Sequence, residues 1–131
     1  ACVAVDFGNS TNFDVVSGEG EYLGGVIGPG VEISLEALTA RTAKLPRIDV
    51  SDPGTAIGKN TVACIQSGFA YGFAGLVDGV NRRLADELGE QVTYLATGGL
   101  ASVIAPQCET VDRVEPLLTL QGLRLIHELN S

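Results

Sequence analysis

Three short apolar runs, separated by two glycine-containing turns, open the chain and restrict its possible folds more than any other feature of the sequence. The runs cover residues 1–5, 13–16 and 22–27, and the turns contain Gly8 and Gly18. Short runs rich in β-branched residues between Gly, Asn and Ser are typical of strands joined by hairpins. We therefore predict three antiparallel strands at the start of the chain.

A pattern of helical spacing follows this strand region. It starts after Gly30 and stops at Pro46, because proline cannot continue a helix. Its apolar positions are Val31, Leu35, Leu38 and Leu45. The spacing predicts a first helix between the two residues that bound it.

The rest of the chain alternates helical and strand patterns. A long helical pattern begins at Asn60 or Thr61, either of which can cap it, and runs to about residue 88, where Gly89 supplies a C-terminal stop. A strand at 91–96, a short helix to about 105, an edge strand near 110–114 and a final helix from about 119 follow. The sequence predicts a single α/β domain over residues 1–131, with a mixed sheet of three antiparallel strands plus two further strands, flanked by helices.

Charge and cysteine content limit the partners and the compartment of the chain. Its formal net charge is −8, and nucleic-acid affinity comes largely from Lys and Arg, so we expect no nucleic-acid partner. Cys2, Cys64 and Cys108 form no C-x-x-C or Cys/His pattern, and no export signal is visible, so we expect reduced thiols and a cytoplasmic location. The uncharged run 60–77 contains polar residues and glycines, which favours a buried helix over a membrane span.

The turn after the first strand carries the residues best suited to chemistry. Asp6 ends the strand, and Gly8, Asn9, Ser10 and Thr11 follow it with small polar groups. Backbone N–H groups and hydroxyls in such a turn suit phosphate oxygens, and a strand-end carboxylate suits a metal ion. The same residues also suit a plain hairpin turn, and their spacing alone leaves both interpretations open.

Several segments, in order, resemble the type III pantothenate kinase family. Residues 5–16 and 20–27 are similar to the second phosphate motif of that family. Further similar segments are 29–34, 58–61, 67–68, 75–79, 97–99 and 118–123. The resemblance covers nearly the whole chain.

The resemblance implies a ribonuclease H-like (actin-like) half of an enzyme that phosphorylates pantothenate from ATP in coenzyme A biosynthesis. It implies that Asp6 binds a monovalent cation, K⁺ or NH₄⁺, and that Asn9 stands at an ATP-contacting threonine position. It places a pantothenate contact at Thr61 and a nucleotide-proximal motif at Thr97, Gly98 and Gly99. ATP with Mg²⁺ is the implied cosubstrate.

The sequence departs from the family pattern in two ways that affect the function we expect. The first phosphate motif and the Gly-x-Asp-Arg motif, which supplies the base in the family, have no counterpart here, so we expect the chain alone not to be a competent kinase. The second departure is the pair Asn9 and Ser10, which resembles the first phosphate motif of the family more than the second phosphate motif. A turn that combines features of both motifs would let one sequence serve as either half of the enzyme, which suits a two-fold homodimer such as a reconstructed or designed half-domain would form. Ordinary sequence drift at Asn9 explains the same residue equally well.

Four glycines, Gly68, Gly72, Gly75 and Gly79, share one stripe of the long predicted helix. Glycine inside a helix costs about 1 kcal/mol relative to alanine, so a stripe of four indicates a close contact with the sheet or with a second subunit. The resemblance favours the subunit contact.

Two alternatives to a phosphate-binding half-domain stay open: a dimer that retains slow ATP hydrolysis or kinase activity, with Asp6 or Asp14 as the base, and a structural half-domain with no ligand.

Overall fold

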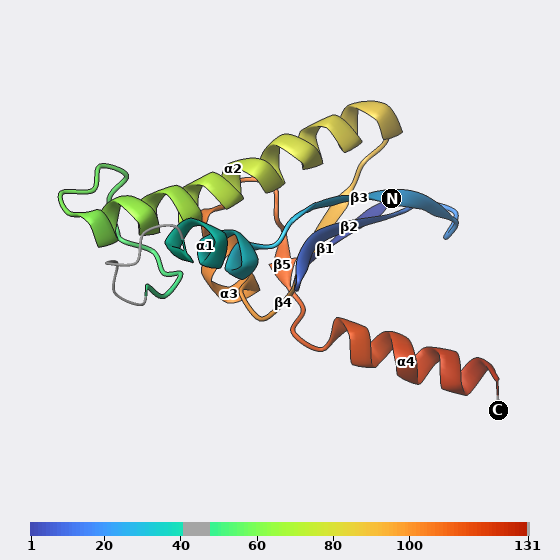
Figure 1. Ribbon diagram of the computed structural model, residues 1–131. Helices are drawn as coiled ribbons and strands as arrows, with labels where there is room; N and C mark the ends of the chain where they lie inside the picture. The colour runs from blue at the N-terminus through green and yellow to red at the C-terminus, as the bar shows by residue number, and fades with distance from the viewer. Residues whose placement is uncertain (41–47, 131) are drawn as a thin grey trace.

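A five-stranded mixed sheet forms the centre of the molecule (Figure 1). The computed structural model describes residues 1–40 and 48–130. The strand order is β3-β2-β1-β4-β5, with β1 antiparallel to β2, β2 antiparallel to β3, and β4 parallel to both β1 and β5. The predicted α/β class with three antiparallel strands and two further strands is therefore confirmed.

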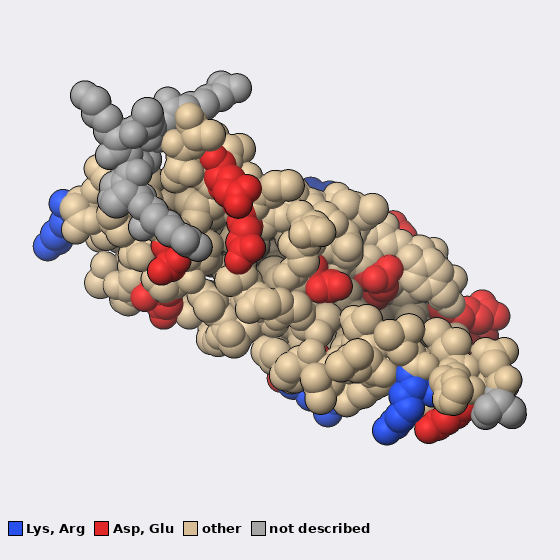
Figure 2. Space-filling view, turned by 60° about the horizontal axis from the view of Figure 1, so that its bottom comes forward, with Lys and Arg blue, Asp and Glu red and all other residues tan. Residues whose placement is uncertain are grey.

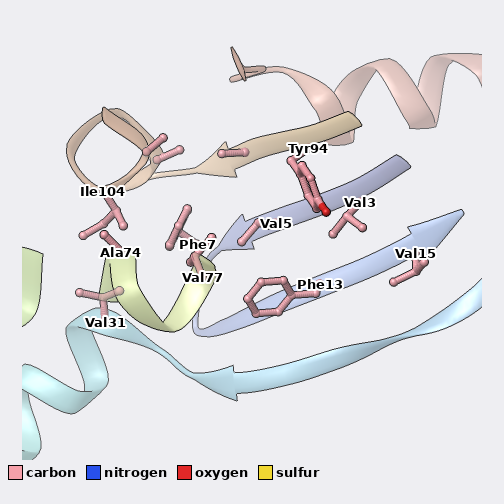
Figure 3. Packing of buried hydrophobic residues seen from close by; sticks show 13 residues of the cluster. Val3, Val5, Phe7, Phe13, Val15, Val31, Ala74, Val77, Tyr94 and Ile104 are labelled. Carbon is pink, nitrogen blue, oxygen red and sulfur yellow. The ribbon is translucent and has the colours of Figure 1, made fainter. Parts of the chain in front are cut away.

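The three opening strands lie close to their predicted positions. They are β1 (Cys2–Phe7), β2 (Ser10–Val16) and β3 (Tyr22–Pro29). Side chains alternate between the two faces of a strand, and every second residue of β1 and β2 is buried, which defines the core face of the sheet. Figure 3 shows these side chains in one cluster, with Phe7 next to Val77 of α2 and Val3 near Tyr94.

The long helix α2 (Thr61–Leu88) begins and ends as the sequence predicts. The structure selects Asn60 as the N-cap, because its side-chain oxygen accepts a hydrogen bond of 2.8 Å from the backbone N–H of Ala63. Gly89 takes the left-handed conformation at φ 63°, and its N–H donates to the carbonyl of Ala85. Both ends of the helix therefore satisfy backbone groups that the helix itself leaves unpaired.

The most deeply buried positions of α2 are not its large apolar residues. Phe69, Phe73 and Leu76 are only partly buried and pack at the edge of the core. The buried positions are mostly small or polar, namely Ser67, Ala70, Ala74, Val77, Asp78 and Asn81. Small side chains let the helix approach the sheet closely, which leaves the bulkier residues at its flanks.

The remaining elements are short, except for the last helix. They are α1 (Val31–Ala40), β4 (Thr93–Gly98), α3 (Ala101–Ile104), the 3₁₀ turn η1 (Ala105–Gln107), β5 (Arg113–Val114) and α4 (Leu118–Leu129). The predicted end of the first helix, at Leu45 and Pro46, falls outside the described residues. Within residues 1–40 and 48–130, no helix combines the length and hydropathy that a membrane crossing requires.

In the part of the chain that the structure describes, helices pack against one face of the sheet. Helix α2 lies over the core face, and α1 and α3 contribute Val31, Ala101 and Ile104 to the same core. The opposite side, which we call the bare face, carries the other alternating residues: Ala4, Asp6, Asn12, Asp14, Val16, Ile27 and Leu95. None of the apolar members of this face belongs to the core cluster found among the described residues.

Candidate functional site

Two parallel strands end side by side at the candidate site. In the register of β1 and β4, Asp6 lies beside Thr97, and Phe7 lies beside Gly98. After Phe7, the chain turns through Gly8 and Asn9 into β2, and the N–H of Gly8 donates to the carbonyl of Ser10 at 3.1 Å. Ligands in open α/β sheets bind outside the carboxyl ends of parallel strands, and this turn lies at that position.

Two glycines allow the segments of the site to approach closely. Gly98 has φ 97°, and a β-carbon there would lie 2.5 Å from the carbonyl oxygen of Phe7. A β-carbon on Gly30 would lie 2.1 Å from the carbonyl oxygen of Asn9. Larger residues would therefore push the loop after β4, or the start of α1, away from the β1–β2 turn.

A pocket of about 430 Å³ lies where these three segments meet. Its walls come from the β1–β2 turn, from the first turns of α1 and from the loop after β4. The lining residues are Phe7, Gly8, Asn9, Glu32, Ile33, Glu36, Gly99 and Leu100. The pocket wall therefore combines the amide of Asn9 and the carboxylates of Glu32 and Glu36 with glycine backbone and apolar side chains.

Asp6 lies next to this turn, on the bare face of the sheet. One oxygen of its carboxylate is 3.6 Å from the position that a β-carbon on Gly8 would take and 2.7 Å from that of a β-carbon on Gly98. Because neither glycine has a side chain, there is space beside the carboxylate. The carbonyl oxygen of Phe7 borders this space, since it lies 2.5 Å from the β-carbon position at Gly98. Oxygen ligands of this kind fit a hard cation such as Mg²⁺ or K⁺.

Acidic and sulfur ligands do not gather into a larger metal cluster. Among residues 1–40 and 48–130, no group of three or more His, Cys, Asp or Glu side chains is arranged to hold a metal ion. Any cation at Asp6 would therefore complete its coordination with backbone oxygens, water or ligand phosphate. The three cysteines are free thiols, and burial raises the pKa of Cys108 to about 12, which keeps that thiol protonated at neutral pH.

The structure brings some predicted site residues to the pocket and not others. Gly8, Asn9 and Gly99 line it, whereas Gly98 is not a lining residue and lies against Phe7 and Asp6. Ser10 donates its hydroxyl hydrogen to the side-chain oxygen of Asn12, 2.8 Å away.

Thr11, Thr97 and Thr61 lie outside the lining. Thr11 is fully buried on the core face, and its hydroxyl donates to the carbonyl of Pro29 at 2.9 Å, so it does not present this group to the pocket. Thr97 is buried beside Asp6, and Thr61 is exposed at the start of α2.

Sequence reasoning does not identify the contribution of α1. Glu32, Ile33 and Glu36 line the pocket, and the two glutamates are four residues apart on one side of the helix. The sequence signal for these residues is Gly30, which lies directly before the helix, because a glycine at a helix start permits close approach of another segment. That approach brings the first turns of α1 to Asn9.

The fold and the pocket define an α/β domain with a pocket at the carboxyl ends of neighbouring parallel strands. A family model for type III pantothenate kinase matches residues 1–83. The chain therefore belongs to the type III pantothenate kinase family.

Type III pantothenate kinases from several bacteria are similar over almost the whole chain. The chain is 52% identical over 129 residues to the one from Moorella thermoacetica, with 98% of this chain and 51% of the relative covered. It is 55% identical over 128 residues to the one from Frankia alni, with 98% and 51% covered. The chain thus spans about half the length of the curated relatives it matches.

A solved structure shares the fold at low sequence identity. It is the crystal structure of a conserved protein from Campylobacter jejuni that is described as a Baf family transcriptional activator. The TM-score is 0.61 at 20% identity, and the match covers 98% of this chain and 57% of that one. At this identity the similarity concerns the fold alone.

Proposed function

We propose that this chain is the nucleotide- and phosphate-binding half of a type III pantothenate kinase, with a ribonuclease H-like fold. The observation that carries the proposal is the pocket at the ends of β1 and β4, lined by Gly8, Asn9 and Gly99. Glycine and short polar residues at a strand end expose backbone N–H groups, which are the donors that phosphate oxygens accept. The membership of the family supports ATP as the ligand.

In this proposal the phosphates of ATP bind at the β1–β2 turn and the nucleoside extends toward the loop after β4. Asn9 contributes its side-chain amide, and Gly98 and Gly99 keep the β4 side of the pocket open. Asp6 holds a cation, with Mg²⁺ or a monovalent ion such as K⁺ or NH₄⁺ as candidates. A bound cation offsets the negative charge of the phosphates, which the acidic chain does not do by itself.

The chain alone is proposed to bind nucleotide without phosphorylating pantothenate efficiently. The family relatives are about twice as long, and the Gly-x-Asp-Arg motif that the resemblance calls for has no counterpart in these 131 residues. Phosphoryl transfer depends on positioning the nucleophile and its base against the phosphate. The proposal includes a cytoplasmic location and a pantothenate contact at Thr61.

Calorimetric titration with ATP and Mg²⁺ tests the binding site. We expect saturable binding that is weakened in both Asp6→Asn and Gly99→Val. A β-carbon on Gly99 meets no protein atom within 4 Å, so the fold should tolerate valine, whose side chain would then occupy space in the pocket that Gly99 lines. The matched control is Asp14→Asn, which changes an aspartate on the same face of the sheet, two strand positions away from Asn12. Equal affinity in the wild type, Asp6→Asn and Gly99→Val would refute the site, and no binding at millimolar ATP would favour the structural half-domain.

Self-association through the glycine stripe of α2 is a further part of the proposal. Gly68, Gly72, Gly75 and Gly79 are exposed, and a β-carbon on any of them would meet no atom within 4 Å. The stripe is therefore open to a second backbone. Gly72→Glu tests this contact, since a charged side chain there should lower the mass measured by light scattering while α2 stays helical.

Residual ATP hydrolysis is the second candidate function. The observation that favours it is the presence of Glu32 and Glu36 in the pocket wall, where a carboxylate can accept a proton from water. Asp14, by contrast, hydrogen-bonds to the hydroxyl of Tyr22 at 2.9 Å and does not line the pocket, so it is a poor base. Phosphate release that falls in Glu32→Gln or Glu36→Gln, with ATP affinity unchanged, would support hydrolysis by this site.

A further inference from the structure

The loop before α2, residues 48–60, is attached to the helix that follows it. Figure 1 shows this loop at the end of the molecule where α2 starts. The buried hydroxyl of Ser67 donates a hydrogen bond to the carbonyl of Ala56. A β-carbon on Gly58 would lie 2.4 Å from the backbone nitrogen of Cys64, so the loop and the first turn of the helix are in direct contact.

One side chain of this loop, Asp52, joins three segments of the chain. One of its carboxylate oxygens accepts from the hydroxyl of Tyr71 at 2.7 Å and from the backbone N–H of Gly54 at 2.8 Å. The other oxygen accepts from the side-chain amide of Gln107 at 3.0 Å. The loop, α2 and η1 therefore meet at a single carboxylate.

The charge of Asp52 strengthens these contacts. The hydrogen bond from Tyr71, and after it the one from Gly54, hold the pKa of Asp52 below its usual value, so the group is ionised at neutral pH. Hydrogen bonds to an ionised acceptor are about twice as strong as those between neutral groups. Acidic side chains are scattered over the face shown in Figure 2, so negative charge alone does not distinguish Asp52. Its distinction is that both oxygens have donors, two of them from other elements.

The segments that Asp52 joins lead to two parts of the proposed site. On one side, the loop runs from Asp52 into Thr61 at the start of α2. On the other side, Gln107 ends η1, which directly continues α3, and α3 follows the pocket residues Gly99 and Leu100. Short helical backbone therefore links Gln107 to the wall of the pocket.

We propose that Asp52 is a positioning residue, which holds the loop before α2, and with it Thr61, in a fixed place relative to the pocket at Gly99. The inference rests on the proposed function, in which Thr61 contacts pantothenate. Asp52 does not touch the ligand; it restricts the positions that the start of α2 can take. A ligand that meets an ordered loop does not have to order it on binding, which raises its affinity.

Titration of pantothenate into the complete chain tests this role. Thr61→Val removes the contact itself and sets the largest loss that a residue acting through Thr61 can cause. We expect its affinity to be roughly threefold to tenfold lower, the range that one hydrogen bond contributes. Asp52→Ala should lie between the wild type and Thr61→Val, and the double variant should bind no more weakly than Thr61→Val alone.

Two further variants separate positioning from a general loss of structure. Asp52→Asn keeps an acceptor for Tyr71, and its amide can donate to the side-chain oxygen of Gln107 once that side chain turns, so it should restore the wild-type affinity. Asp49→Ala removes a carboxylate of the same loop but keeps the backbone carbonyl to which Gln66 donates, so it should bind as the wild type does. Circular dichroism confirms that each variant is folded.

The outcomes distinguish this inference from the proposed function. Equal affinity in the wild type and Asp52→Ala would overturn the inference, as would a double variant whose loss is the product of the two single losses, because Asp52 would then not act through Thr61. A Thr61→Val variant that binds as the wild type does would overturn the pantothenate contact of the proposed function, and the inference with it. A wild type that binds ATP with Mg²⁺ but no pantothenate would do the same and leave the nucleotide site standing.

Discussion

Asp78 is the residue on which the internal polar structure of the molecule depends most. It is 6% exposed, on the core side of α2. One carboxylate oxygen accepts from the N–H of Glu109 at 2.8 Å, and the other accepts from the N–H and the hydroxyl of Thr110 at 3.0 and 2.6 Å. The amide of Asn81 donates to the same hydroxyl at 2.9 Å. These bonds attach α2 to the segment that leads into β5.

Removal of this carboxylate should destabilise the fold. Asp78→Ala leaves two backbone N–H groups without an acceptor, and we expect a loss of about 3 kcal/mol, since a hydrogen bond to a charged group contributes about 1.5–3 kcal/mol. Urea unfolding followed by circular dichroism measures the change. Asp86→Ala is the control on the exposed side of α2 and should change stability by less than about 0.5 kcal/mol. Similar losses in both variants would contradict the role of Asp78.

The same aspartate should make stability depend on pH in the acid range. Burial by itself would raise the pKa of Asp78, but the hydrogen bonds from Glu109 and Thr110 outweigh it and hold the pKa below its ordinary value. An aspartate in the unfolded chain titrates near pH 3.9, so the folded state binds fewer protons below about pH 5. The contribution of Asp78 is therefore present above the unfolded pKa and is lost as the pH falls through the folded pKa.

We accordingly expect the free energy of unfolding to fall more steeply for the wild type than for Asp78→Asn between about pH 5 and about pH 3. Urea titrations at several pH values in this window give the two slopes. Parallel curves would show that Asp78 does not titrate differently in the two states.

At the scale of elements, the N-cap of α2 gives the clearest prediction. Asn60→Ala removes the acceptor for the N–H of Ala63 and should cost about 1 kcal/mol, whereas Asn60→Asp keeps an acceptor and should retain most of the stability. Thermal unfolding of the three proteins measures this difference. If alanine and aspartate at this position were equally stable, the cap would contribute nothing.

The order and type of the elements can be predicted from the sequence because local signals specify them. Gly89 ends α2, and the alternating apolar residues of β1 and β2 fix which face is buried. The buried side of α2 is not predictable in this way, because hydrophobic spacing points to large residues such as Phe73, while close packing on the sheet selects Ala70 and Ala74. Tertiary packing decides that face.

At the scale of the whole molecule, sequence motifs predict three of the eight residues that line the pocket, Gly8, Asn9 and Gly99. The turn at Gly8 and Asn9 and the glycines after β4 are recognisable as motifs, since each is continuous in the chain. Glu32 and Glu36 join them only because Gly30 lets α1 approach the carbonyl oxygen of Asn9, a contact between segments about 20 residues apart. The burial of Thr11 likewise follows from the register of β2 in the sheet, which turns its hydroxyl toward Pro29.

Amide hydrogen exchange should divide the molecule into a slow core and a fast α4. Exchange is slowest where backbone hydrogen bonds lie under packed side chains, so we expect the greatest protection in β1, β2 and the middle of α2. Helix α4 buries no side chain, and its amides should exchange at close to the free rate in dilute solution. Strong protection of α4 in dilute solution would instead mean that the helix packs on its own sheet.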